Sequence, residues 1–557
     1  MHDLLQELGQ DIVNRESRKE AGQRSRIWLY EDFNHILMND TGSEQIEGVV
    51  LDLVDRGEGY LSSVKGFVKM KYVRVLILRY VQFLHDLEYL SNELKYLEWY
   101  EYPFKSPPST FQPNKLVELH MRCSRIERLW KAVKPVKSLK NIDLSYSRNL
   151  IKTLDFTEVP NLEELNLQGC TKLCEVHHSI GVLKRLVSLN LKDCKTLMCL
   201  PSTTCNLKSL KILILSGCLK LTKLPERLGD MTSLEVFDAA GVGTEELPLV
   251  ETGDCMHRYQ LASMLPCLTT LPFLRKLNLS GCNLPEGAIP NDLTSFPLLK
   301  SLDLSGNDFL SIPSSICQLS RLTYLSISKC KRLQYLPDLP SSIEHLSLER
   351  CISLKALPNL SQLSGVTYLY FENCKSLQSL PDLPLRIEHL DMRNCTSLQT
   401  LPNLVQLSAL KYLEFLNCTN LKLLPDLSSS IEHIDVENCT LLQTLPNLFE
   451  KQNLDKRFYI GFLNCSGLNG CEGKFSMALT WLKSYLLWIQ EVRQLCERQK
   501  NYFQDELGRV LGVKLIKRRF QRPDFYFFLP GSKIPDWFNH KGRKHLTSWH
   551  LHDKLLE

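Results

Sequence analysis

Tyrosine and histidine alternate at one recurring position in the C-terminal half of this 557-residue chain. The alternating residues are Tyr324, His345, Tyr368, His389, Tyr412 and His433. Histidine nitrogens are common zinc ligands, whereas tyrosine gives a protein interface a large contact area with little loss of conformational entropy. The pattern therefore predicts either a metal site or a protein-recognition surface.

The spacing of the histidines argues against a metal ion. Two nitrogens that share one zinc ion lie within about 4 Å of each other, because Zn–N distances are about 2.0–2.1 Å. If each alternating residue occupies its own strand, the histidines lie roughly 9–10 Å apart, since neighbouring strands are about 4.8 Å apart. We therefore expect no metal. Two interpretations remain: duplication copied a pattern without a function, or the column is an aromatic recognition stripe, which we carry forward as the candidate site.

Carboxylates flank the alternating residues on both sides. Those that directly precede the histidines are Glu344, Glu388 and Glu432. Those that follow in the same segments are Glu349, Glu372, Asp391, Glu414, Asp435 and Glu437. Basic side chains at Lys329, Arg350 and Arg393 only partly offset this charge. We expect an acidic surface here that takes part in partner binding, with ordinary solvated charge as the alternative.

Catalytic and cofactor motifs are missing from the sequence. It contains no HExxH, GxSxG, GxGxxG or GxxxxGK[ST] motif and no CxxC pair. Cys465 and Cys471 are not spaced as a zinc pair. We therefore expect no catalytic residues, no metal site and no bound cofactor in this chain.

A repeat explains how these residues reach one surface. The pattern LxxLxLxxC appears as LEELNLQGC from Leu162 and LVSLNLKDC from Leu186, and sixteen copies follow one another from Val73 to Ile431. Their steps are 21 to 25 residues, except for one step of 40 residues after Leu234. The leucines of LxL share one face of a short strand, and stacked repeats bury them as one continuous core. We predict an α/β fold, a leucine-rich-repeat solenoid shaped as a curved horseshoe with a parallel sheet on its concave face.

Ten cysteines occupy the last position of the repeat pattern. They are Cys170, Cys194, Cys218, Cys282, Cys330, Cys351, Cys374, Cys395, Cys418 and Cys439. A small side chain with a weak S–H donor suits a buried position where the chain leaves the strand. We expect buried, reduced thiols that bond to backbone, with disulfides or metal ligation as the alternative.

Composition narrows the class of protein further. The apolar fraction is 43% and the charged fraction is 23%, as in ordinary folded chains. Residues 454–557 carry a net charge of +8 and the preceding residues −3. A nearly neutral repeat body lacks the basic face of a nucleic-acid binder. Because no apolar run reaches membrane-spanning length and no signal peptide opens the chain, we expect a cytoplasmic protein. The basic cluster KLIKRRFQR from Lys514 suggests the nucleus as a second location.

Both ends of the chain resemble one family. MHDLLQELG…GQRSRIW at the N-terminus resembles the end of the nucleotide-binding switch of plant intracellular nucleotide-binding leucine-rich-repeat immune receptors. GSEQIEGVVLDL from Gly42 and LKYLEWYEYPFKSPPSTF from Leu94 resemble its TIR-containing branch. FYFFLPGSKIPDWFNHKG from Phe525 resembles that branch's post-repeat domain, a jelly-roll or immunoglobulin-like sandwich.

The resemblance implies three regions. They are a remnant of the winged-helix end of the switch (1–45), the repeats with an insertion near 240–272 (46–453), and a helical cap with a truncated post-repeat domain (454–557). We expect a short N-terminal helix, a helix over residues 476–509 and a partial C-terminal α/β region. The insertion is a second candidate binding surface, because insertions in repeat arrays often form loops on the binding face, with a disordered excursion as the alternative.

The resemblance also implies a function. In the family this portion binds a pathogen effector or a guarded host protein, contacts the nucleotide-binding domain and regulates receptor activation. His2 and Asp3 match the family's MHD motif, which lies against bound ADP, but without a phosphate loop we expect no ADP or ATP binding here. The prediction is thus a non-enzymatic recognition region of a disease resistance protein. The alternatives are a stand-alone decoy or adaptor, or part of a longer NAD-cleaving protein with a TIR domain upstream.

Overall fold

The computed structural model describes most of the repeat region. The described residues are 3–53, 59–61, 63–83, 85, 87–130, 133–222, 224–244, 265, 268, 270–444, 459–461, 464–469, 526–528 and 549–550. The chain divides into two compact units, residues 1–307 and 308–557. His2, most of the insertion, the helix expected over 476–509 and the basic cluster from Lys514 lie outside the described residues.

The first unit opens with helices, as the N-terminal sequence predicts. They are α1 (Asp3–Glu16), the 3-10 turn η1 (Ala21–Gln23) and α2 (Tyr30–Met38). In α2 the side chains of Phe33, Ile36 and Leu37 are fully buried, and the Phe33 ring lies 5.7 Å from that of Phe67. This contact joins α2 to the first turns of the repeat stack.

Parallel strands of the first unit follow one another in sequence order. They are β1 (Arg26–Ile27), β2 (Gly48–Asp52), β4 (Val75–Arg79), β6 (Tyr96–Trp99), β7 (Glu118–His120), β8 (Asn141–Asp143), β9 (Glu164–Asn166), β10 (Ser188–Asn190), β11 (Ile212–Ile214), β12 (Val236–Asp238), β13 (Lys276–Asn278) and β14 (Ser301–Asp303). A separate parallel pair is β3 (Gly59–Leu61) with β5 (Val81–Phe83), and the 3-10 turns are η2 (Lys65–Lys69), η3 (His178–Val182), η4 (Ser202–Asn206) and η5 (Leu228–Asp230). The 40-residue step does not interrupt the sheet, because Val236 pairs directly with Lys276.

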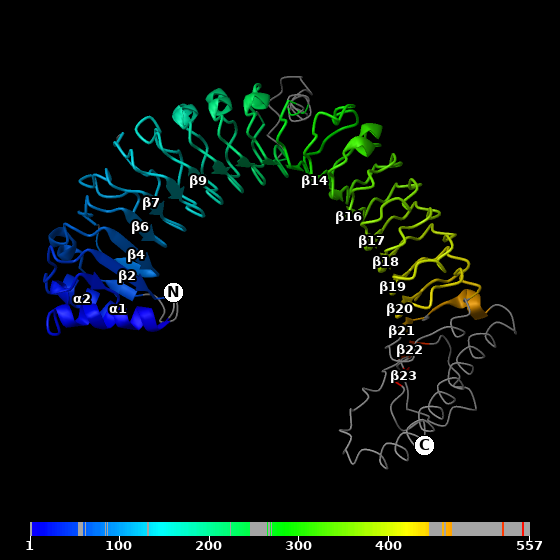
Figure 1. Ribbon diagram of the computed structural model, residues 1–557, viewed down its shortest axis with the longest axis horizontal. Helices are drawn as coiled ribbons and strands as arrows, with labels where there is room; N and C mark the ends of the chain where they lie inside the picture. The colour runs from blue at the N-terminus through cyan, green and yellow to red at the C-terminus, as the bar shows by residue number, and fades with distance from the viewer. Residues whose placement is uncertain are drawn as a thin grey trace, which may run out of the picture. The chain divides into compact units, whose positions relative to one another are not determined.

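The second unit continues the same plan. Its strands are β15 (Tyr324–Ser326), β16 (His345–Ser347), β17 (Tyr368–Tyr370), β18 (His389–Asp391), β19 (Tyr412–Glu414), β20 (His433–Asp435), β21 (Tyr459–Gly461), β22 (Tyr526–Phe528) and β23 (Trp549–His550), with 3-10 turns η7 (Ser314–Gln318) and η8 (Ser466–Asn469). β15 to β22 pair in parallel and β23 is antiparallel. The strands line one side of the stack in each unit, and the connecting segments form the other (Figure 1).

Alternation within each strand divides core from surface. In β17 the middle residue Leu369 is fully buried, as is Phe371 just after the strand, while Tyr368 points to the exposed face. This alternation repeats from turn to turn because successive strand residues point to opposite faces. The predicted leucine-rich-repeat solenoid with a parallel sheet is confirmed, with about sixteen turns.

Buried thiols join successive turns. Column cysteines donate their S–H to a carbonyl of the preceding turn, for example Cys170 to Leu144 at 3.2 Å and Cys418 to Met392 at 3.1 Å. The same bond is made by Cys194, Cys218, Cys282, Cys351, Cys374, Cys395, Cys439 and Cys465. All cysteines among the described residues are free. The predicted thiol role is confirmed, and Cys465 adds a rung that the sequence pattern did not include.

Two turns replace the cysteine with another donor. Ser147 donates its hydroxyl to Met121 O at 3.0 Å, and Asn307 donates its amide to Leu279 O at 2.9 Å. A hydroxyl or an amide therefore satisfies the same carbonyl as the thiol. The position requires a compact donor rather than sulfur chemistry.

The residue before the cysteine adopts a left-handed backbone. Asn394, Asn417 and Asn438 have φ of 62°, 63° and 59°, a region that asparagine tolerates better than most residues. Their side chains form a ladder, in which Asn417 donates to Asn394 and Asn438 to Asn417, both at 2.7 Å. Asn464 extends the ladder to Asn438 at 2.8 Å. The ladder fixes the edge of the sheet in the last turns.

Candidate protein-recognition surface

The alternating tyrosines and histidines form one column across β15 to β20, here called the Tyr/His column. Tyr324 pairs with His345, Tyr368 with His389, and Tyr412 with His433. Tyr324, Tyr368 and Tyr412 keep 37%, 44% and 40% of their surface exposed. The predicted placement on one exposed sheet face is what the structure shows.

Neighbouring rings in the column contact each other. The His389 ring lies 5.5 Å from that of Tyr412 and 6.1 Å from that of Tyr368, and the Tyr412 ring lies 6.0 Å from that of His433. Aromatic pairs at such separations favour tilted or edge-on packing. The histidines thus hold the tyrosines in place, and an intervening strand separates any two histidines. No group that could hold a metal ion occurs within the described part of the chain.

The glutamates that precede the histidines lie outside the column. Glu344 is exposed at the start of β16, and Glu388 accepts a bond from Lys411 Nζ at 2.9 Å. Glu432 precedes His433 at the start of β20. The structure does not bring these three glutamates together, because each occupies a different alternate turn.

The carboxylates that follow the histidines form a denser group. Arg393 donates to Asp391 at 2.6 Å and lies 3.2 Å from Glu414 and 3.9 Å from Glu372. Glu414 Oε1 also lies 3.2 Å from His389 Nε2. The contact with His389, then the charges of His389 and Arg393, outweigh burial and lower the pKa of Glu414. Arg393 therefore lies within ion-pair distance of three carboxylates.

Asp435 and Glu437 have no such partner. Within the described residues, no lysine or arginine lies within ion-pair distance of either carboxylate; Asp435 Oδ1 accepts a bond from the Glu437 backbone N–H at 2.9 Å. Burial raises the pKa of both carboxyl groups, and the charge of Asp435 raises that of Glu437 further. Burial also lowers the pKa of His433 beside them. At this end of the surface, two carboxylates therefore lack a direct ion pair with a lysine or arginine of the described residues.

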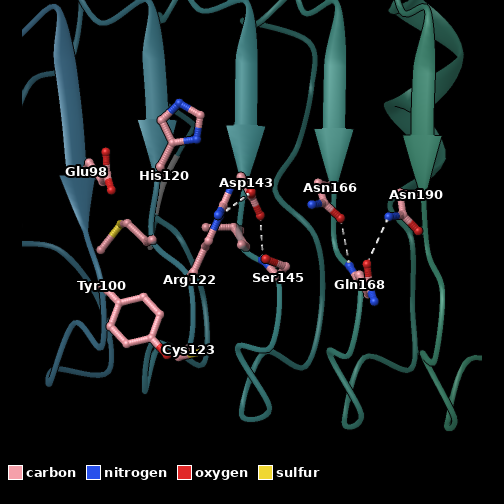
Figure 2. Close-up of polar contacts among 12 residues, drawn as sticks. Glu98, Tyr100, His120, Arg122, Cys123, Asp143, Ser145, Asn166, Gln168 and Asn190 are labelled. Carbon is pink, nitrogen blue, oxygen red and sulfur yellow. Dashed lines mark hydrogen bonds and ion pairs between the residues drawn. The ribbon is translucent and has the colours of Figure 1, made fainter. Parts of the chain in front are cut away.

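Part of the equivalent face of the first unit pairs its own charges, as Arg122 and Asp143 do in Figure 2. Arg122 donates to Asp143 at 2.7 Å, and Arg79 donates to Glu98 at 2.6 Å and to Asp52 at 2.8 Å. Figure 2 also shows Gln168 between Asn166 and Asn190: its backbone N–H donates to Asn166 of the same turn, and its side-chain oxygen accepts from Asn190 of the next turn. Sequence reasoning missed this network, although opposite charges at adjacent repeat positions were a signal for it.

The fold defines the class of protein: a leucine-rich-repeat protein. The family model for the Leucine Rich Repeat matches residues 115–134, 273–296 and 298–319. No helix within the described ranges has the length and apolarity that crossing a membrane requires.

The relatives of the chain are plant disease resistance proteins of the TIR type, so the resemblance predicted from the sequence is confirmed. This chain is 32% identical over 440 residues to TMV resistance protein N of Nicotiana glutinosa, and the match covers 64% of this chain and 38% of that protein. It is 40% identical over 348 residues to Disease resistance protein RPP2A of Arabidopsis thaliana, covering 61% of this chain and 21% of that protein. The chain thus spans well under half of these relatives.

Solved structures with a similar fold are leucine-rich-repeat proteins. The LRR protein LIC12759 of Leptospira interrogans is 20% identical, with a TM-score of 0.42 over 70% of this chain and 94% of that chain. YopM of Yersinia enterocolitica is 21% identical, with a TM-score of 0.37 over 75% of this chain and 92% of that chain.

Proposed function

We propose that this chain is the protein-recognition region of a plant immune receptor, and that the Tyr/His column contacts the partner. The partner is a pathogen effector or a host protein that the receptor guards, and binding regulates receptor activation in defence signalling. The region itself is non-enzymatic and binds no cofactor. In a longer protein it also contacts a nucleotide-binding domain.

The observation that carries the proposal is the exposure of three tyrosines on a rigid sheet. Tyrosine is enriched where proteins bind each other, because it combines apolar area with a hydroxyl and few rotatable bonds. Strand pairing and ring contacts hold Tyr368 and Tyr412 at fixed positions before any partner arrives. Preorganisation of this kind lowers the entropic cost of association.

The free, buried thiols favour a reducing compartment, so the proposal places the protein in the cytoplasm, with the nucleus as the second location. Whether the recognition region acts within a TIR-containing receptor or as a decoy or adaptor does not alter the surface it uses. The alternative, in which the chain is part of a longer NAD-cleaving protein, places the catalytic activity in an upstream TIR domain. It gives the Tyr/His column no role.

Photo-crosslinking tests the proposal. We expect Tyr368→p-benzoylphenylalanine and Tyr412→p-benzoylphenylalanine to form a discrete covalent adduct with a protein in plant extract, because partner atoms lie against these rings. The matched control is Tyr335→p-benzoylphenylalanine, since Tyr335 is 53% exposed but lies between β15 and β16, outside the column. Mass spectrometry identifies the adduct. Equal adducts from all three positions, or an adduct from position 335 alone, would contradict the proposal.

A further inference from the structure

The spacing of the tyrosines sets a length scale for the partner. Tyr324, Tyr368 and Tyr412 occupy alternate strands, and two strand spacings are about 9.6 Å. A polyproline II segment rises about 3.1 Å per residue, so three residues advance about 9.3 Å. Every third residue of an extended segment laid across the strands would therefore meet an equivalent tyrosine. The six strands from β15 to β20 cover about 24 Å, or about eight such residues.

The charged side chains on the same face indicate which residue types the partner segment carries at these positions. Asp391, Glu414 and Glu372 share Arg393, whereas Asp435 and Glu437 are half-buried and have no lysine or arginine within ion-pair distance among the described side chains. A lysine or arginine on the partner would form an ion pair with Asp435 or Glu437. The same side chain would lie against a tyrosine ring, where cation–π attraction adds to the ion pair. The chain already makes one such contact, with Lys355 Nζ 5.7 Å from the centre of the Tyr335 ring.

We propose that the sheet face formed by β15 to β20 binds an extended segment of a partner protein that carries a basic side chain at every third residue. This inference rests on the proposed function and specifies the chemistry of the partner. The tyrosines supply the periodic contacts, and the carboxylates of Asp435 and Glu437 supply the preference for lysine or arginine over acidic residues.

Defined peptides test the inference. Three fluorescent probes of about nine residues are required: one with arginine at every third position, one with the same arginines clustered at one end, and one with glutamate at every third position. Fluorescence anisotropy with the full chain measures the affinities. We expect the periodic arginine peptide to bind at least about tenfold more tightly than either control. Equal affinity of the three peptides, or no binding of the periodic peptide, would overturn the inference.

Charge removal supplies the matched variants. The double variant Asp435→Asn/Glu437→Gln is expected to bind the periodic arginine peptide at least about fivefold more weakly, a loss of roughly 1 kcal/mol. The turn geometry survives, because the amide that replaces the Asp435 carboxylate keeps an oxygen to accept the bond from the backbone N–H of residue 437. Asp238→Asn is the control, since Asp238 makes the same turn bond to Ala240 in the first unit. An equal loss with Asp238→Asn would also overturn the inference.

The two proposals fail separately. If the crosslink from positions 368 and 412 forms but the periodic peptide does not bind, the recognition surface stands and the basic partner is wrong. A further readout is stability: because burial raises the pKa of Asp435, its ionised form disfavours folding above that pKa. Asp435→Asn should therefore leave the melting temperature unchanged or higher at neutral pH while it weakens binding.

Discussion

Raising the pH from about 8 to about 11 is expected to unfold the repeat stack steeply, because the pH then passes through and above the ordinary thiol pKa of about 8.5. Burial raises the pKa of Cys170, Cys218, Cys282, Cys395 and Cys465 to about 12, and it raises those of Cys194, Cys351, Cys374, Cys418 and Cys439 as well. The folded chain thus keeps its thiol protons at a pH where the unfolded chain loses them. Each such thiol lowers the free energy of unfolding by about 1.4 kcal/mol per pH unit in this window.

Serine variants isolate the thiol contribution from that of lysine and tyrosine, which also titrate at high pH. Cys351→Ser, Cys374→Ser and Cys395→Ser together keep a donor at each rung, as Ser147 does naturally. Urea unfolding, followed by circular dichroism at about one-unit steps between pH 8 and 10, gives the slope of the free energy of unfolding against pH. A smaller slope in the triple variant is the expected result. An unchanged slope would show that the thiols titrate normally and are not buried donors.

Phe371→Ala is expected to destabilise the second unit by about 3–5 kcal/mol. Phe371 is fully buried, and its carbonyl accepts the Cys395 thiol, so the cavity opens beside a rung of the thiol column. Tyr368→Ala in the same turn is the matched control, because that side chain faces outward and its loss should cost less than about 1 kcal/mol.

Chemical denaturation of both variants measures the difference. Equal losses would mean that the assignment of the two faces in β17 is wrong. A large loss for Tyr368→Ala alone would mean that the column is part of the core, and it would remove the basis for a recognition surface.

Much of this fold could be predicted from spacing alone. The LxL alternation places Leu369 in the core and Tyr368 on the surface, and the constant repeat step carries that placement from turn to turn. The thiol role of Cys170 and Cys418 followed from the same repetition. Local patterns suffice here because each turn contacts only its neighbours.

Features that depend on substitution within a column were harder to predict. Ser147 and Asn307 replace the thiol, and Cys465 ends a copy, RFYIGFLNC, in which Arg457 stands where the pattern has its first leucine. Predicting the asparagine ladder would have required knowing that the residue before the cysteine has a left-handed backbone.

The charge network of the first unit and the distinct surroundings of Asp435 and Glu437 were also missed. Each depends on which side chains reach one another across strands, and repeat spacing fixes the strand but not the rotamer. The sequence predicted an acidic surface without distinguishing the carboxylates around Arg393 from those that no lysine or arginine of the described residues contacts. That distinction came only from the distances.

The affinity of the crosslinked partner, once purified, tests the central claim most directly. Isothermal titration calorimetry compares the wild-type chain with Tyr368→Ala/Tyr412→Ala, and with Tyr335→Ala as the control outside the column. We predict that the double variant binds at least about tenfold more weakly, since truncating interface anchors costs about 2 kcal/mol or more. We also predict an unchanged melting temperature and a wild-type affinity for Tyr335→Ala. An unchanged affinity in the double variant would contradict the account and show that the Tyr/His column does not bind the partner.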